Sequence, residues 1–181
     1  MHSISPVLSV HKTLFGKFLT LGNEYFCGTT VIVWFSPIRK LHRFKYFNSG
    51  LKKNLYNSRN EAISKSTGEI LSFLDCDDWW EPSKLAKQVP HFQDDTVSIV
   101  YSNYLEHNQK TKKIRTVKEK KIYSGFIQEK IIHDYHIGIL TTLIRKNIFK
   151  ELGGYNNFFH ICGDFEFNVR ASEKNKIVGI T

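Results

Sequence analysis

Apolar and polar positions fall into a regular order only from about residue 50 of this chain. Residues 55–66 repeat apolar side chains at helical spacing, and Gly68 stands where the C-terminal cap of a helix belongs. The apolar run 70–74 predicts a buried strand, because it is short and uninterrupted. This strand stops abruptly at an acidic turn, residues 75–78.

The rest of the chain alternates between the same two kinds of pattern. Pro82 suits the first turn of a second helix. Further strands are expected at 97–101 and 139–144, and further helices at 146–152 and 164–172. Helices that alternate with buried strands predict an α/β domain with a mixed, mainly parallel sheet flanked by helices.

The first 45 residues show no sustained periodicity, apart from a β-branched run that predicts one strand at Thr30–Phe35. We therefore divide the chain into an unassigned segment, 1–45, and a domain, 46–181.

The net charge of +9 is partly local, and it favours anionic partners. Seven basic residues lie within 110–121, a segment that is expected as a hairpin. One interpretation is a solvated hairpin, and the other is a patch for a membrane surface or a phosphate group. The run has no interleaved aromatic residue before Tyr123, so it does not favour single-stranded nucleic acid.

Cysteine usage and hydropathy bear on location. The three cysteines are far apart and form no CxxC pair, which indicates neither a zinc site nor a disulfide framework and suits a reducing compartment. No apolar stretch approaches the ~20 residues of a membrane-spanning helix, and no secretory signal is recognisable. We expect a cytoplasmic protein, with peripheral contact at the cytoplasmic face of the inner membrane as an option.

The acidic turn is the most informative feature of the sequence. Asp75, Asp77 and Asp78 place three carboxylates within four positions, and their mutual repulsion favours a bound cation. Carboxylate oxygens at the carboxyl end of a strand suit Mg²⁺ or Mn²⁺, which can bridge a diphosphate. The simpler alternative is that one of these aspartates caps the helix that begins near Pro82.

Several segments resemble the central block of family 2 glycosyltransferases, which are GT-A-like (Rossmann-like) enzymes that use nucleotide-diphospho-sugars. The block comprises residues 57–62, Gly68-Glu69 and 73–85, followed by Gln88. Downstream, 143–155 resembles the family's stretch that ends in two glycines and an aromatic residue, and 164–170 resembles its stretch around the general base. The resemblance covers roughly residues 45–178.

The resemblance implies roles for four residues in an inverting, metal-assisted transfer of a hexosyl group. Asp77 would coordinate Mn²⁺ or Mg²⁺, and Asp75 would contact the ribose or a metal-bound water. Arg59 would face the nucleotide, and Asp164 would take the proton of the acceptor hydroxyl. Each role has a simpler alternative. Arg59, for example, could be an ordinary charged residue of a helix, and Asp164 could be a helix N-cap.

The chain also departs from the family pattern. Residues 1–45 contain neither the Pro-Thr-Tyr-Asn nor the Asp-Asp-Gly-Ser segment that holds the nucleotide base and ribose, and Gly163 replaces the acidic residue before the base. A domain of this family without its first strands would have an incomplete sheet with an unpaired edge, which we therefore expect. We expect a transferase that moves sugar to a glycan or lipid-linked acceptor with impaired activity. The alternatives are a non-catalytic remnant of such an enzyme and a basic anion-binding module. Neither the donor sugar nor the acceptor, the linkage or the oligomeric state follows from the sequence.

Overall fold

The computed structural model describes residues 23–27, 30–35, 44–47, 54–75, 78–108, 110–117 and 121–181, the first three segments by their backbone alone. Its main feature is a seven-stranded sheet in the order β3-β1-β2-β4-β8-β5-β9. The strands are β1 (Asn23–Cys27), β2 (Thr30–Phe35), β3 (Phe44–Phe47), β4 (Ile70–Asp75), β5 (Val97–Ser102), β8 (Leu143–Arg145) and β9 (Lys176–Ile180).

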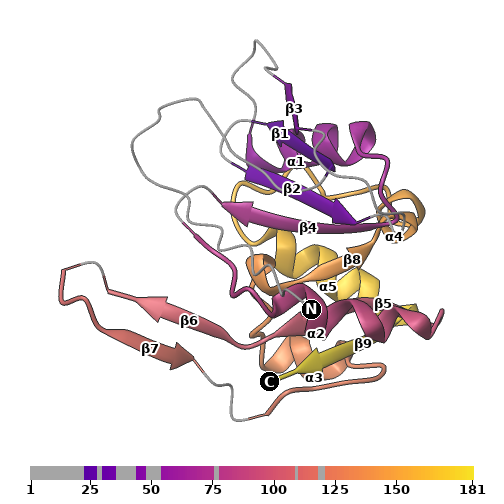
Figure 1. Ribbon diagram of the computed structural model, residues 1–181. Coiled ribbons are helices and arrows are strands. Elements are labelled where there is room, and N and C mark those ends of the chain that lie inside the picture. Colours follow the sequence, from indigo (N-terminus) through magenta and orange to yellow (C-terminus); the bar gives the residue numbers. More distant parts are fainter. Residues whose placement is uncertain are drawn as a thin grey trace, which may run out of the picture.

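The predicted α/β class, with a GT-A-like sheet flanked by helices, is confirmed by this architecture (Figure 1). The strand pairings refine the expectation of a mainly parallel sheet. Among the described strands, β1 with β3 and β5 with β9 are parallel, whereas the pairs between β1, β2, β4, β8 and β5 are antiparallel. The sheet is therefore mixed, with its parallel pairs at the two ends.

The N-terminal strands complete the sheet on one side of β4. The predicted strand at Thr30–Phe35 is confirmed as β2, which pairs with β4 from Thr30 opposite Asp75 to Phe35 opposite Ile70. The strands β1 and β3 extend the sheet beyond it. The edge of β4 that was expected to be unpaired is thus covered, and the predicted domain boundary at residue 45 stays a prediction.

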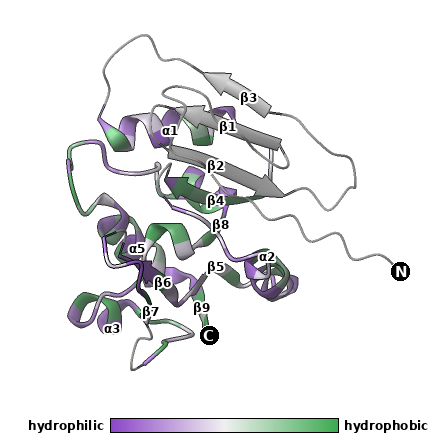
Figure 2. Ribbon diagram, turned by 60° about the vertical axis from the view of Figure 1, so that its left-hand side comes forward, coloured by the Kyte–Doolittle hydropathy of each residue, from purple (hydrophilic) through white to green (hydrophobic). Residues whose placement is uncertain are grey.

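Helices cover both faces of the central strands. One face of β4 and β5 packs with α1 (Leu55–Lys65), α3 (Gln128–His133), α4 (Lys146–Glu151) and α5 (Gly163–Lys174) around a large aromatic core that contains Phe73 and Phe167. The other face packs with α2 (Lys84–Gln88) and the 3-10 helix η1 (Val89–Gln93) around Val100 and Leu143. In Figure 2 the strand β4 is accordingly coloured mainly as hydrophobic.

The helix expected at 55–66 is confirmed as α1, but its end is not made by Gly68. Asn54 caps its start, with its side chain accepting from the backbone N–H of Asn57. At the other end the backbone N–H and the hydroxyl of Ser66 both donate to carbonyls of the last turn. Because Ser66 satisfies these carbonyls, no left-handed glycine is needed, and the prediction for Gly68 was wrong.

The expected strand at 139–144 was half wrong. Residues Ile139–Thr141 form the 3-10 turn η2, and only Leu143–Arg145 form the strand β8. The hydroxyls of Thr141 and Thr142 donate to the carbonyls of Gly138 and Ile139, which holds the backbone in a turn.

The hairpin expected within the basic segment is confirmed. The strands β6 (Tyr104–His107) and β7 (Ile114–Val117) pair as a separate two-stranded sheet that projects from the body of the molecule (Figure 1). Lys110, Lys112 and Lys113 lie exposed near its tip, while Lys118 and Lys120 fall outside the described residues. None of the described helices is long and apolar enough to cross a bilayer.

Candidate active site

The acidic turn follows directly from the end of β4. Asp75 is the last residue of this strand, and the backbone N–H of Asp78 donates to its carbonyl at 3.1 Å. This contact closes a tight turn, so the backbones of Asp75 and Asp78 lie close together. Asp77, the predicted metal ligand, and Cys76 lie outside the described residues.

Arg59 lies directly beneath this turn. Its side chain projects from α1, is only 3% exposed, and places Nη2 at 3.4 Å from Oδ1 of Asp75. The guanidinium also lies 5.6 Å from the ring centroid of Tyr56 and 5.7 Å from that of Phe73. Its Nε has no hydrogen-bond partner within the described part of the chain. Arg59 therefore holds the Asp75 carboxylate, and its predicted contact with a nucleotide stays a prediction.

Asp164, the predicted general base, lies in the first turn of α5. The helix N-terminus favours its negative charge. Its carboxylate is close enough to the phenols of Tyr135 and Tyr56 to raise the pKa of each, after the larger effect of burial. Asp164 thus lies near the phenols of the buried Tyr56 and the part-buried Tyr135.

Tyr56 links the predicted base to the acidic turn. It lies one helical turn before Arg59 on α1, and its hydroxyl accepts a 2.6 Å hydrogen bond from the backbone N–H of Gly163. Asp75, Arg59, Tyr56 and the N-terminus of α5 therefore form one continuous chain of contacts. The fold brings three of the four predicted site residues together around α1.

The same contact explains why Gly163 departs from the family pattern. A Cβ atom added at Gly163 would lie 2.6 Å from two ring carbons of Tyr56, closer than such atoms approach in proteins. The acidic residue that the resemblance leads one to expect would clash with this buried ring.

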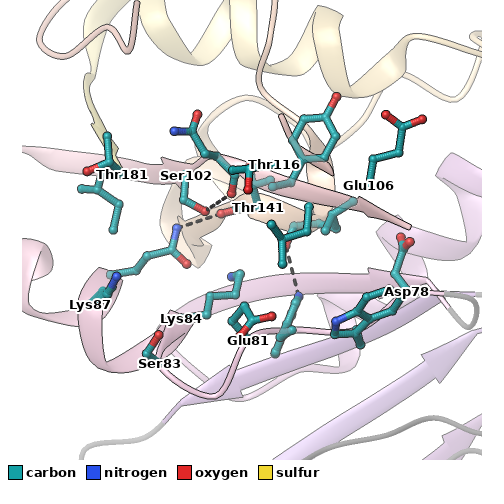
Figure 3. A pocket seen from close by; sticks show the side chains of 18 of the residues that line it. Asp78, Glu81, Ser83, Lys84, Lys87, Ser102, Glu106, Thr116, Thr141 and Thr181 are labelled. Atoms are coloured by element: carbon teal, nitrogen blue, oxygen red, sulfur yellow. Dashed lines mark hydrogen bonds between the residues drawn. The ribbon is translucent and has the colours of Figure 1, made fainter. Parts of the chain in front are cut away.

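A pocket of about 570 Å³ opens on the other side of the acidic turn (Figure 3). Asp78, Trp79, Trp80 and residues of α2 form one wall, and the end of β5 with the β6–β7 hairpin forms the other. Sequence reasoning missed this pocket, because its walls come from segments that are distant in the chain. The adjacent tryptophans were the one available signal.

Within the described residues, no three His, Cys, Asp or Glu side chains gather as a ready-made metal centre. The donor set of the acidic turn nevertheless suits a hard divalent cation, since the Asp75 carboxylate is held at the rim by Arg59 and a second aspartate follows within the same turn. Asp77 lies between them in sequence.

Comparisons with known proteins agree with this geometry. A sequence model of glycosyl transferase family 2 matches residues 35–153. An Escherichia coli UDP-Glc:alpha-D-GlcNAc-diphosphoundecaprenol beta-1,3-glucosyltransferase, WfgD, is 27% identical over 106 residues, covering 59% of this chain and 40% of the relative. An uncharacterized glycosyltransferase of Rickettsia conorii is 29% identical over 120 residues, covering 62% of this chain and 19% of the relative.

Among solved structures, the crystal structure of S. aureus TarS 1-349 superposes with a TM-score of 0.55 at 16% identity, covering 75% of this chain and 40% of that one. This likeness supports the fold alone. The fold defines an α/β protein with a GT-A-like sheet, and the family match extends over more than half of the chain. The chain belongs to glycosyl transferase family 2. It spans about 40% of the length of WfgD.

Proposed function

We propose that this chain transfers a sugar from a nucleotide-diphospho-sugar to a glycan or lipid-linked acceptor, with inversion at the anomeric carbon. The observation that carries the proposal is the buried Arg59 that holds Asp75 at the end of β4, with Asp164 joined to the same helix through Tyr56. A family match through this region supports it.

The acidic turn would hold Mn²⁺ or Mg²⁺. Asp77 is the proposed ligand, and Asp75, oriented by Arg59, would contact the ribose or a metal-bound water. The ion would neutralise the charge that develops on the leaving diphosphate. The contribution of this chain is to fix the Asp75 carboxylate before the donor arrives, because Arg59 is buried and already in contact with it.

Asp164 would act as the general base. As the acceptor hydroxyl oxygen forms its bond to the anomeric carbon, the bond from that carbon to the diphosphate oxygen breaks, and the hydroxyl proton passes to the Asp164 carboxylate. The nucleoside diphosphate leaves with the electron pair. The hydrogen bond between Tyr56 and Gly163 would fix the position of Asp164, since it anchors the backbone immediately before it.

The names of the relatives support a proposal for the substrate class. WfgD is named for a UDP-glucose donor and a GlcNAc-diphosphoundecaprenol acceptor. We therefore propose a uridine diphosphate sugar as donor and a lipid-linked saccharide diphosphate as acceptor. Such a reaction would place the protein in the cytoplasm, in peripheral contact with the inner membrane through its basic hairpin.

The proposed donor site can be tested by calorimetric titration of UDP in the presence of Mn²⁺. We expect saturable binding that is lost in Asp77→Ala and weakened about tenfold in Arg59→Met. The matched control is Asp95→Ala, because the Asp95 side chain is fully exposed and remote from the acidic turn in sequence. Binding that survives Asp77→Ala unchanged would remove the metal assignment and leave the non-catalytic alternative.

Transfer itself is expected to be slow. Residues 1–45 lack the segments that hold the base and ribose in the family, and misplacing a reacting group by ~1 Å can lose about a hundredfold in rate. Donor consumption should be measured across UDP-, GDP- and dTDP-sugars with Mn²⁺. We expect weak turnover that Asp164→Asn abolishes, and fast turnover would show that residues 1–45 hold the nucleotide in another way.

A further inference from the structure

The pocket beside the acidic turn is lined by two indole rings, those of Trp79 and Trp80, that are held in place by their neighbours. Nε1 of Trp80 donates to the carbonyl of Leu140 at 3.1 Å, and the ammonium of Lys84 lies 4.5 Å from the centre of its ring. Trp79 meets His107 of the hairpin edge-on, at 5.6 Å between ring centroids. Both rings line the pocket as fixed, flat surfaces.

Trp79 is nevertheless 40% exposed. Exposing a large indole forgoes much of the free energy that its burial would contribute. Its neighbour Leu105, which also lines the pocket, is 37% exposed. An apolar surface that lies ready within a concave site is typical of ligand binding.

The polar groups of the pocket define the chemistry of that ligand. They comprise three carboxylates, of Asp78, Glu81 and Glu106, and two amino groups, of Lys84 and Lys87, together with a series of hydroxyl and amide groups that includes Ser102, Asn103, Thr116 and Thr141. Hydroxyl and amide groups both donate and accept hydrogen bonds, and carboxylates accept them. The charges of the lining are of both signs and nearly balance, so they give no strong preference for a charged ligand. The lining thus favours a neutral molecule rich in hydroxyl groups.

A pyranose ring combines both properties. Its hydroxyls point outward around the ring, and its C–H groups form an apolar face with weakly positive hydrogens that suits the negative face of an indole. We propose that the pocket between α2 and the β6–β7 hairpin binds the saccharide of the acceptor, with Trp79 as its main stacking surface and Glu106 as a hydrogen-bonding partner. This proposal rests on the proposed function.

The position of the pocket assigns it to the acceptor rather than to the donor. Neither Arg59 nor Asp75 lines it, whereas Asp78, the last residue of the acidic turn, does. The turn therefore lies between the proposed donor site and the pocket. A saccharide that extends from the pocket past Asp78 would reach the proposed donor site.

The hairpin would then be a wall of the acceptor site. Tyr104, Glu106 and His107 of β6 and Thr116 of β7 line the pocket. Arg115, on the same hairpin, forms an exposed ion pair with Glu106. The pocket-lining residues thus lie on the strands of the hairpin, apart from the basic residues near its tip.

The test is titration of the 181-residue chain with an alkyl diphosphate ester of N-acetylglucosamine, followed by tryptophan fluorescence and checked by calorimetry. We expect saturable binding that is about tenfold weaker in Trp79→Ala and less affected in Trp79→Phe, which keeps an aromatic face. Phe158→Ala is the matched control, because Phe158 is an exposed aromatic residue that does not line the pocket. Absence of saturable binding, or equal affinity in Trp79→Ala, would overturn the proposal.

Two further measurements separate the sources of a signal. Inorganic pyrophosphate should not compete, and competition by it at equal concentration would show that the diphosphate and not the sugar is bound, against the proposal. UDP binding with Mn²⁺ should be the same in Trp79→Ala as in the unchanged protein, and weakening of UDP binding to the same degree would assign the pocket to the donor. Loss of UDP binding in Asp77→Ala alone tests the proposed function separately.

Discussion

The hydroxyl oxygen of Tyr56 accepts a 2.6 Å hydrogen bond from the backbone N–H of Gly163, across 107 positions of the chain. This contact ties α1, which carries Arg59, to the start of α5, which carries Asp164. Burial raises the pKa of the Tyr56 phenol, so the hydroxyl stays neutral over the physiological range. The geometry of the candidate site therefore depends on a hydrogen bond between two uncharged groups. No motif of charged residues in the sequence could have predicted it.

Replacing Gly163 with alanine should destabilise the protein. The added Cβ would lie 2.6 Å from the Tyr56 ring, which is buried and cannot turn away. Overpacking of this kind costs about 1–3 kcal/mol. Urea unfolding of Gly163→Ala should show a loss in the free energy of unfolding within that range.

The control is a second glycine in a tolerant setting. At Gly138 an added Cβ would meet only a methyl carbon of Thr141 at 3.6 Å, an ordinary contact, and the backbone angles suit any residue. Gly138→Ala should therefore unfold at the same urea concentration as the unchanged protein or slightly above it. Equal stability of the Gly163 and Gly138 variants would mean that Tyr56 moves aside at little cost.

Lys84 predicts a dependence of stability on pH. Burial holds the pKa of its ammonium well below the ordinary value for lysine, and its described contacts are the hydroxyl of Ser72, at 3.3 Å, and the ring of Trp80. Between this lowered pKa and the ordinary value of about 10.4, the unfolded chain binds more protons than the folded one. The free energy of unfolding must then rise with pH across this window. As pH decreases towards the folded-state pKa, this gain in stability is lost.

The variant Lys84→Met, which has a similar volume, should remove this dependence. As pH rises towards 10, the free energy of unfolding of the unchanged protein should increase relative to that of Lys84→Met. The increase should be up to about 1.4 kcal/mol per pH unit. Lys87→Met is the control, since Lys87 is exposed on the same helix. A difference that stays constant from pH 7 to pH 10 would show that Lys84 is protonated throughout.

The exposed tip of the hairpin should be dispensable for folding. Lys112 and Lys113 are exposed, and the hairpin forms a sheet of its own. The double replacement by glutamate should leave the melting temperature nearly unchanged while weakening binding to vesicles that contain anionic lipid, because basic residues near such a surface contribute about 1 kcal/mol each. The same reversal at the exposed Lys150 and Lys174 controls for total charge. A loss of the folded state would show that the hairpin supports the core.

The sequence predicted the helices and strands whose apolar residues follow a regular spacing within a short segment. The helix predicted at 55–66 is α1, and the strands predicted at 70–74 and 97–101 are β4 and β5. Their apolar patterns were recognisable because these residues pack into the two cores on either face of the sheet. The strand β9 was missed, since its five residues are held by parallel pairing with β5, a contact across more than seventy positions. Such pairing leaves little mark in a short window of sequence.

The candidate site was predictable to the same extent. Asp75, Arg59 and Asp164 could be selected from their motifs, and the contact of Arg59 with Asp75 agrees with a shared site. The burial of Arg59 was not foreseeable, because it results from aromatic residues of α1 and β4 that enclose the guanidinium. The pocket was missed for a similar reason, since the hairpin that forms its wall follows β5 and the tryptophans precede it.

Cys162 offers the most direct test of the backbone at the start of α5. This residue has φ 59° and ψ 17°, a left-handed conformation, and its side chain is exposed. The left-handed region costs an ordinary L-residue roughly 1–2 kcal/mol, less for asparagine and nothing for glycine, and most for a β-branched residue. Because the thiol is exposed, substitution removes little packing, and the backbone cost dominates.

The expected order of stability at position 162 is therefore asparagine above cysteine, and cysteine above valine. Cys162→Asn should raise the free energy of unfolding by a few tenths of a kcal/mol up to about 1 kcal/mol, whereas Cys162→Val should lower it by about 1 kcal/mol or more. Glycine gains from the relaxed backbone but adds freedom to the unfolded chain, so Cys162→Gly should fall between asparagine and cysteine. Urea unfolding of the three variants measures the order directly. If valine proved as stable as asparagine, the residue before Gly163 would not be left-handed in solution, and the approach of Asp164 to Tyr56 would have to be built on a different turn.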